Sequence, residues 1–278
     1  IRNYKSSLLN KNKNLTYLFS DLDLDLDLKN FSKSNLTLRI EKVYNDSLLK
    51  LFNDLLIEET TSLKPSSSDN LTNDFKVFLD HKNYDLTAGF QAYENLQKGN
   101  SDRYEYVLPY YEFSREIFSD FKFGGLNLNS NGNNILNNTN QLKSQIINDI
   151  SFSSYDYFSS NGFKNNLDIS IKNLNSVGKN VSDYKSSPQI ELSSIFNFQT
   201  SYPLRKETEN FSNFLTPKLS FRFNPSDMKN YNSAERTITT DNIFSLNRLG
   251  LDDTHESGRS LTIGLDYKKE MLSNINKY

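Results

Sequence analysis

The most regular pattern in the chain is a strict alternation of apolar and acidic residues near its beginning. The segment 17–28 reads Tyr-Leu-Phe-Ser-Asp-Leu-Asp-Leu-Asp-Leu-Asp-Leu. Successive side chains of an extended strand point to opposite faces, so the leucines share one face and the aspartates share the other. A helix would spread those carboxylates around its whole circumference. The pattern therefore predicts a β-strand with one apolar and one acidic face.

The same two-residue period recurs along the rest of the chain. It predicts roughly eleven strands in all, each about ten residues long, near the length at which a tilted strand crosses a bilayer. After the first strand, the runs fall at 35–44, 71–80, 84–95, 104–114, 120–129, 142–153, 164–174, 188–199, 213–223 and 260–270.

Short and long connections tend to alternate between these runs. The longer ones are predicted at 45–70, 130–141, 175–187 and 224–259. Alternate connections of an up-and-down meander lie at opposite ends of the strands, so one end has tight turns and the other has long loops. That asymmetry is expected of an outer-membrane barrel. The fold predicted is all-β, an antiparallel up-and-down transmembrane β-barrel that is incomplete in this chain.

Composition agrees with a sheet that has one wet face. The hydrophobic share is 36% and the mean hydropathy is −0.66, which is polar for a globule of 278 residues. The aromatic share of 13% is nevertheless too high for a disordered chain. The two values agree if only alternate residues are apolar. A soluble β-sandwich also alternates, but its strands are often shorter and its loops lack the bias toward one end.

Charge and cysteine content exclude several classes. A net charge of −2 argues against a nucleic-acid-binding protein, and the absence of Cys excludes disulfides and thiolate metal sites. No apolar run approaches the length of a spanning helix. The chain begins Ile-Arg-Asn-Tyr, without Met or an apolar leader. We expect either a cytosolic protein or a true N-terminus that lies upstream.

No arrangement of residues predicts catalysis or metal binding. The Asp21, Asp23, Asp25 and Asp27 series lacks the glycine and the terminal glutamate of a calcium loop. His81 and His255 are isolated in the sequence, and we interpret both as loop residues. We therefore expect no enzyme, no cofactor and no metal site. Asp23, Asp25 and Asp27 are predicted to face a hydrated lumen.

The stretch 240–258 reads Thr-Asp-Asn-Ile-Phe-Ser-Leu-Asn-Arg-Leu-Gly-Leu-Asp-Asp-Thr-His-Glu-Ser-Gly. A loop this long, with so many side chains that can form specific contacts, is usually functional or anchored. It leads into an alternating strand. It resembles the N-L-F-x-x-N-R-x-x-G-x-D-R loop of the LptD family of lipopolysaccharide-assembly proteins, with Asp253 where that family often has Arg. The matching residues are Asp241, Asn242, Phe244, Asn247, Arg248, Gly250, Asp252 and Gly258.

Four further segments, in the same order, resemble this family. Residues 214–225 are similar to its L-x-P-x-x-x-Y-x-Y-x-P strand, and 187–192 to the P-x-F strand before it. Residues 107–113 resemble an L-P strand, and 41–54 resemble K-V-S-D-x-x-Y-x-x-D-F with Leu in place of aromatics. Each match is weak alone, but their shared order covers most of the chain.

The resemblance implies a very large barrel in the outer membrane of a Gram-negative bacterium, which carries lipopolysaccharide into the outer leaflet. The implied partners are lipopolysaccharide, an LptE-like plug lipoprotein, a periplasmic lipopolysaccharide bridge and outer-membrane lipids. The family's N-terminal jellyroll, its disulfides and its lateral gate are not in this sequence, so residues 1–278 are expected to be a middle slice of the barrel domain, which would reach the periplasmic bridge only through the missing N-terminal domain.

Two loops receive specific expectations from the resemblance. The loop that begins at residue 45 is expected to fold toward the plug, and it contains a short predicted helix after Ser47. Its contacting residues would be Asn45, Asp46, Leu51, Phe52 and Asp54. The loop 240–258 is expected to be locked over or into the barrel mouth by Asn247, Arg248 and its glycines.

Two alternatives remain at this point. Another outer-membrane barrel, such as a porin or a receptor, would share the architecture but lack the series of motifs. A soluble β-sandwich binding module would stay in solution without detergent.

Overall fold

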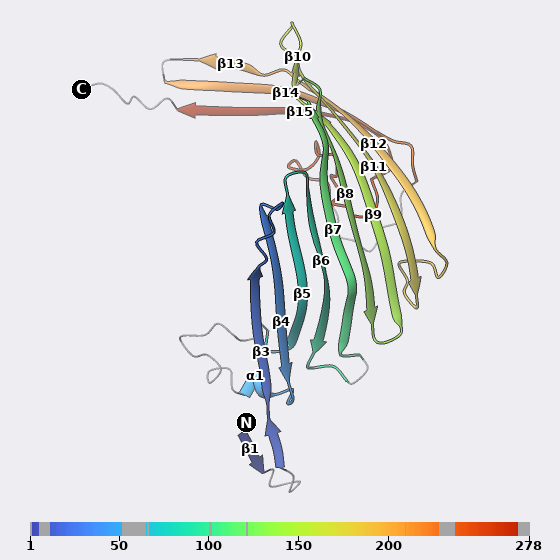
Figure 1. The fold of residues 1–278 in the computed structure, drawn as a ribbon. Helices are drawn as coiled ribbons and strands as arrows, with labels where there is room; N and C mark the ends of the chain where they lie inside the picture. The colour runs from blue at the N-terminus through green and yellow to red at the C-terminus, as the bar shows by residue number, and fades with distance from the viewer. Residues whose placement is uncertain are drawn as a thin grey trace, which may run out of the picture. The chain divides into compact units, whose positions relative to one another are not determined.

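The computed structural model describes residues 2–5, 12–51, 65, 67–99, 102–120, 122–208, 210–227 and 237–271. Within these residues the fold is almost entirely β, and the one helical turn is α1 (Leu48–Leu51). Thirteen strands form an antiparallel up-and-down sheet that does not close on itself (Figure 1). The all-β meander expected from the sequence is confirmed.

Most of the observed strands match the predicted runs. A separate two-stranded sheet contains β1 (Arg2–Lys5) and β2 (Asn12–Leu15). The large sheet contains β3 (Tyr17–Asp25), β4 (Lys33–Val43), β5 (Asn70–His81), β6 (Tyr84–Asn95), β7 (Tyr104–Asp120), β8 (Gly124–Asn137), β9 (Gln141–Ser154), β10 (Tyr157–Phe158), β11 (Lys164–Lys179), β12 (Gln189–Ser201), β13 (Leu204–Glu207), β14 (Phe211–Asn224) and β15 (Gly258–Met271).

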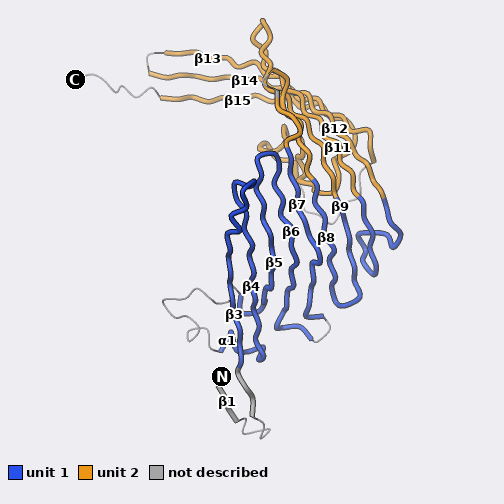
Figure 2. Tube along the Cα trace, in the orientation of Figure 1, with its two compact units in different colours: residues 1–115, 130–146, 175–189 blue, residues 116–129, 147–174, 190–278 orange. Residues whose placement is uncertain are grey.

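The chain divides into two compact units, coloured separately in Figure 2. Unit 1 contains Ile1–Arg115, Ser130–Ile146 and Asn175–Gln189, and unit 2 contains Glu116–Asn129, Ile147–Leu174 and Ile190–Tyr278. The long strands β7, β8, β9 and β11 contribute residues to both units.

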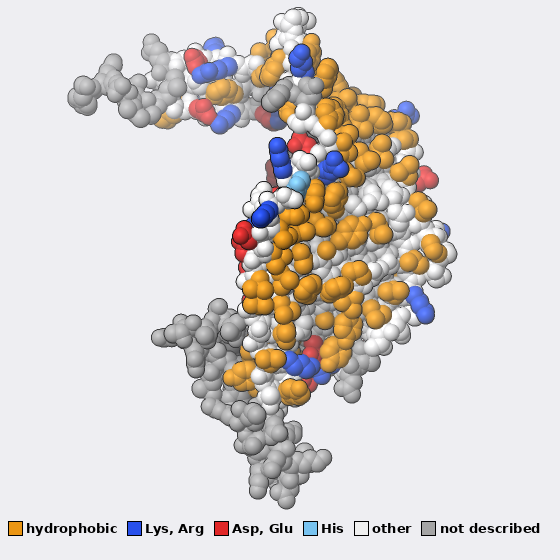
Figure 3. Space-filling model, in the orientation of Figure 1, with side chains coloured by type: hydrophobic (Ala, Val, Ile, Leu, Met, Phe, Trp, Pro, Cys, Tyr) orange, Lys and Arg blue, Asp and Glu red, His pale blue; other side chains and the backbone are white. Residues whose placement is uncertain are grey.

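In unit 1 the register of β3 to β6 sorts side chains between two faces, because directly opposed residues of an antiparallel pair point to the same side. One cross-strand row is polar and contains Asp21, Arg39, Asp74 and Gln91. The next row is apolar and contains Leu22, Leu38, Phe75 and Phe90. The Phe75 and Phe90 rings stack with centroids 6.2 Å apart. Figure 3 shows hydrophobic side chains gathered on the viewed face of this unit.

A small hydrophobic cluster lies where α1 packs in unit 1. Val43, Leu48, Leu49, Leu71 and Leu96 are buried together, and Phe19 packs against them. The predicted helix is confirmed over its first turn. Leu48 and Leu49 of this turn are buried, whereas Leu51 is 71% exposed.

In unit 2 the strands β12 and β13 act as one strand. Both pair with the same side of β14, and the register of Ser201 opposite Lys218 continues as Leu204 opposite Leu215. The Tyr202 N–H bridges the gap by donating to the Pro217 carbonyl at 3.0 Å. Pro203 has no N–H to add to the ladder. The strand therefore changes direction without slipping.

The two faces of unit 2 differ as sharply as those of unit 1. A polar cross-strand row contains Asn197, Arg222 and Ser260, and the neighbouring row contains Phe198, Phe221 and Leu261. The apolar side chains are exposed, and Ile190 and Ile263 are 79% and 77% accessible. The polar ones are buried, with Asn197 at 0% and Arg222 at 4%. The usual distribution of a soluble protein is thus reversed.

The predicted long loop at 130–141 is wrong, because β8 and β9 form a tight hairpin there. Asn138 and Thr139 have positive φ values of 50° and 59°, and the Asn140 N–H donates to the Asn137 carbonyl at 3.2 Å. Two central residues with positive φ define a type I′ turn. The longest connections are at 44–69 and 225–257, and the predicted alternation of short and long connections is kept only in part, because 155–163 is as long as 180–188.

Two other predicted boundaries change. The run predicted as a strand at 120–129 contains the end of β7 and the start of β8, where Gly124 has a φ of 137°. The series of aspartates on the first predicted strand also ends earlier than predicted. Asp27 lies after β3, with a φ of 45° and its N–H donating to Asp25 Oδ1 at 3.1 Å.

Candidate functional site

The candidate site is the connection between β14 and β15, whose residues 237–257 are seated on the polar face of unit 2. The register places Lys218 opposite Gly264, Ser220 opposite Thr262, Arg222 opposite Ser260 and Asn224 opposite Gly258. Several of these polar side chains are buried although they lie on strands. Arg222 and Asn224 donate hydrogen bonds to loop carbonyls, and Ser220 donates to Asn197 on β12.

Asparagine side chains fold the loop onto itself. Asn242 accepts from the Thr239 N–H at 2.8 Å and donates to the Thr237 carbonyl at 3.1 Å. Asn247 accepts from the Leu251 N–H at 2.9 Å and donates to its carbonyl at 2.7 Å, around Gly250 with a φ of 61°. Leu251 is then only 1% exposed. These local bonds give the loop a defined shape without a regular ladder.

Phe244 attaches the loop to the strands. Its ring lies over Gly264 so closely that an added Cβ would be 2.7 Å from it. Gln199 donates to the Phe244 carbonyl at 2.5 Å, and the Lys218 Nζ lies 5.8 Å from the ring centroid. Glycine is needed at 264 because the close approach excludes any side chain.

Glu256 holds two arginines, one from the loop and one from β14. Arg248 Nε donates to Oε2 at 2.6 Å and its Nη2 to Oε1 at 2.5 Å, while Arg222 Nη1 lies 3.4 Å from Oε2. Arg222 also donates to the Leu246 carbonyl. Burial alone would raise the pKa of Glu256. The hydrogen bond from Arg248 and the two positive charges outweigh burial and hold that pKa below its usual value.

A lysine makes the second charged attachment. Lys172, on β11, pairs with Asp149 and donates to the Asp252 carbonyl at 2.8 Å. Ser170 donates to the other oxygen of Asp149 at 3.1 Å. The lysine side chain is 8% exposed, so its charge is compensated within the unit.

His255 is a buried member of the same network, which the sequence did not indicate. It is 5% exposed and lies 3.0 Å from the Ser193 hydroxyl through Nδ1. Asn224 donates to the carbonyls of His255 and Glu256 at 3.4 and 3.0 Å. Burial, together with the positive charges of Lys172 and Arg222, lowers the pKa of His255 to about 4. The ring is therefore neutral at physiological pH.

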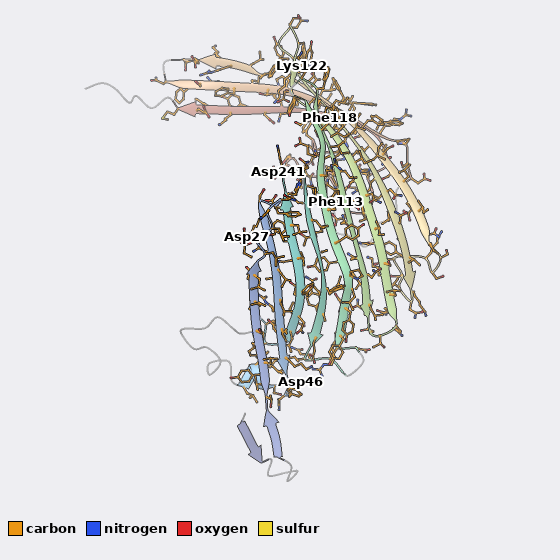
Figure 4. All side chains as sticks on the ribbon, viewed as in Figure 1. Asp27, Asp46, Phe113, Phe118, Lys122 and Asp241 are labelled. Atoms are coloured by element: carbon orange, nitrogen blue, oxygen red, sulfur yellow. The ribbon has the colours of Figure 1, made fainter. Side chains whose placement is uncertain are left out.

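The family-like loop residues thus have different environments. Asn242, Phe244, Asn247, Arg248 and Gly250 shape the loop or attach it, and Asp252 contributes its backbone carbonyl. Asp241 is exposed (Figure 4), and Gly258 starts β15 with a φ of 90°. The sequence missed the strand partners, namely Lys172, Gln199, Arg222 and Gly264. Their only signal was a polar or small residue on the wet face of a strand.

The other expected residues lie in unit 1. Asp23 accepts from Asn35 at 3.3 Å, and Asp25 ends β3 opposite Asn35. Asp27 is outside the strand, so its predicted place on a strand face is wrong.

The loop expected to contact a plug is described only at its beginning. Asn45 accepts from the Ser47 N–H at 2.9 Å, and Asp46 pairs with Arg103 at 2.8 Å (Asp46 is labelled in Figure 4). Phe52 and Asp54 lie outside the described residues.

No group of three or more potential metal ligands occurs among the residues that the structure describes. In the same part of the chain, no helix is long and apolar enough to span a membrane. Comparison of the sequence with protein-family models and with curated proteins finds no match.

Proposed function

We propose that this chain forms part of the wall of an outer-membrane β-barrel that delivers lipopolysaccharide to the outer leaflet of a Gram-negative cell. The apolar faces of the strands meet lipid, and the polar faces line a wet lumen. Transport requires no chemical step in this chain. An LptE-like plug lipoprotein and a periplasmic lipopolysaccharide bridge are the proposed partners.

The observation that carries the proposal is the sorting of side chains in unit 2. The exposed apolar face of β12, β14 and β15 includes Leu192, Phe221, Leu261, Ile263 and Leu265, between 46% and 68% exposed apart from Ile263 at 77%. Monomeric soluble proteins seldom expose contiguous apolar patches of this kind. Lipid would cover such a face at no desolvation cost.

The folded loop on the opposite face supports the lipopolysaccharide assignment over a generic barrel. Residues 241–258 carry the motif that resembles the LptD family. Glu256 and Lys172 hold this loop against the polar face that we assign to the lumen. A porin or receptor has no reason to share that motif. A soluble β-sandwich would instead cover the apolar face with a second sheet.

The membrane part of the proposal is tested with single tryptophans, because the chain has none of its own. Leu265 and Asp266 are adjacent on β15 and point to opposite faces. In vesicles with brominated acyl chains, we expect strong quenching of Leu265→Trp and weak quenching of Asp266→Trp. Equal quenching of the two variants, or a chain that remains soluble without detergent, contradicts the proposal.

The lipopolysaccharide part needs the intact gene in its own cell. Depletion of the protein should lower the amount of lipopolysaccharide at the cell surface, measured by antibody binding to whole cells. A matched depletion with a rescue copy is the control. Unchanged surface lipopolysaccharide after complete depletion would exclude the lipopolysaccharide function, but it would not contradict the membrane part of the proposal.

A further inference from the structure

Unit 1 contains an open groove of about 450 Å³ where β6 connects to β7 and where β8 connects to β9. Five of the twelve residues that line it are Asn or Gln. Asn70 begins β5, Asn95 ends β6, Asn137 ends β8 and Gln141 begins β9, with Asn138 in the turn between the last two. The groove therefore collects amides that are far apart in the sequence, because alternate strand ends meet there.

The charged residues of the groove cancel one another. Lys98 and Arg103 contribute two positive charges, and Asp102 and Glu105 contribute two negative ones. A groove for phosphate or for nucleic acid would have a positive excess. An amide both donates and accepts hydrogen bonds, as does a hydroxyl group. The wall therefore matches a neutral ligand with many hydroxyl groups.

A tyrosine adds the apolar surface that such a ligand also needs. Tyr93 lines the groove on the same face of the sheet as Asn70, Asn95 and Glu105. Its hydroxyl donates to Gln91 at 2.9 Å, which holds the ring in place. A tyrosine presents a flat apolar body beside its polar tip. Sugars have the complementary character, with C–H groups on the ring faces and hydroxyl groups around the edge.

The wall is fixed before any ligand arrives. Asn70 and Asn95 are directly opposed in the β5–β6 ladder. Asn138 is held by the type I′ turn and donates to Gln141 at 3.3 Å. Arg103 is held by Asp46 at 2.8 Å and by Glu94 at 2.9 Å. Fixed side chains lose little freedom on binding, which favours affinity.

From these features we propose that the groove binds a short segment of a neutral oligosaccharide. The inference goes beyond the proposed function, since it concerns a binding site in unit 1 and does not depend on transport. It also does not depend on which cell or polymer supplies the sugar.

The test is saturation-transfer NMR on the full chain in a phosphocholine detergent, because sugar detergents would compete for the groove. The probes are maltotriose, cellotriose and chitotriose, with inorganic phosphate as the charged comparison. We expect saturable binding of at least one trisaccharide and no competition by phosphate. Binding of none of the three, or displacement by phosphate, overturns the proposal.

Variants locate the binding. The double variant Asn95→Ala with Gln141→Ala should weaken binding about tenfold, the effect of losing two neutral hydrogen bonds. The control Gln189→Ala removes an amide that, among the residues the structure describes, bonds to its neighbours Ser187 and Pro188, and it should bind as the unmodified chain does. If the double variant unfolds, Gln141→Glu serves in its place with the same expected direction. Wild-type affinity in a folded groove variant contradicts the site. Lipid quenching and surface lipopolysaccharide are independent readouts, so either proposal can fail alone.

Discussion

Both carboxylate oxygens of Glu256 accept hydrogen bonds from Arg248, at 2.6 and 2.5 Å. This pair holds the loop between β14 and β15 against the buried Arg222. Bidentate pairs of this kind are strong and directional. One carboxylate pairs with two guanidinium groups, so the seating of the loop depends on it.

Replacement of this carboxylate should release the loop. Glu256→Gln leaves Arg222 and Arg248 close together without a counter-charge, which we expect to destabilise the seated loop by about 2–3 kcal/mol. That corresponds to roughly a 30-fold to 150-fold increase in the open population. Tryptic cleavage after Arg248 measures it. Glu207→Gln, which removes an exposed partner of Arg205, is the matched control and should leave cleavage unchanged.

A side chain at position 264 should displace Phe244. Gly264→Val places its Cβ within 2.7 Å of the ring, and we expect a cost of about 1–3 kcal/mol from overpacking. Adding Phe244→Ala should recover part of that cost, since the clash is then removed. Hydrogen exchange of the loop amides measures the change in loop stability for each variant. Gly125→Ala, where the nearest atom would be 3.9 Å away, should have little effect, and the absence of any rescue would contradict the contact.

Acid should loosen the loop through His255. Its pKa is about 4 in the folded protein and 6.5 without the fold, so the open form binds more protons between these values. Loop stability is then constant above pH 6.5 and falls as pH drops from 6.5 toward 4, by at most about 1.4 kcal/mol per pH unit. The depressed pKa of Glu256 acts in the same direction below its ordinary value of 4.5. Urea-induced release, followed by the fluorescence of Leu246→Trp, should lose most of this slope in His255→Gln. A slope that persists would assign the pH dependence elsewhere.

Removing Lys172 alone should cost more stability than removing both Lys172 and its partner Asp149. Lys172→Met leaves Asp149 with an uncompensated charge, and we expect a loss of about 2–4 kcal/mol. Adding Asp149→Leu should restore much of it, because neither partner of the pair then carries a charge. Thermal unfolding in detergent compares the two. Lys164→Met, which breaks an exposed pair with Asp156, is expected to change the midpoint little.

The hairpin of β8 and β9 can be made more stable. Thr139 has a φ of 59°, which is strained for a β-branched residue. Thr139→Gly produces the Asn-Gly sequence that type I′ turns favour, and it should stabilise the hairpin by up to about 1 kcal/mol. Slower hydrogen exchange at Asn137 and Gln141 would confirm this. Faster exchange would contradict the prediction, because it would mean that the glycine destabilises the hairpin.

The alternation of apolar and polar residues predicted most strands of the meander, but not the short strands β1, β2, β10 and β13. It failed at 138–140 because asparagine-rich sequence is equally typical of loops and of type I′ turns. It also could not pair Phe244 with Gly264 or Glu256 with Arg222. Those pairs depend on how a long loop folds back, which no local period encodes. His255 illustrates the same limit, since its hydrogen-bond partner Ser193 lies on β12, far away in the sequence.

The interruption of β12 and β13 at Tyr202 and Pro203 restricts how this wall can change in evolution. The pairing of Leu204 with Leu215 is the one expected if Tyr202 and Pro203 continued the strand as ordinary residues. A single inserted or deleted residue would turn every side chain beyond it to the other face. Changes of length at this point must therefore come in pairs, and an odd one would place Leu204 among the polar side chains and Arg205 among the apolar ones.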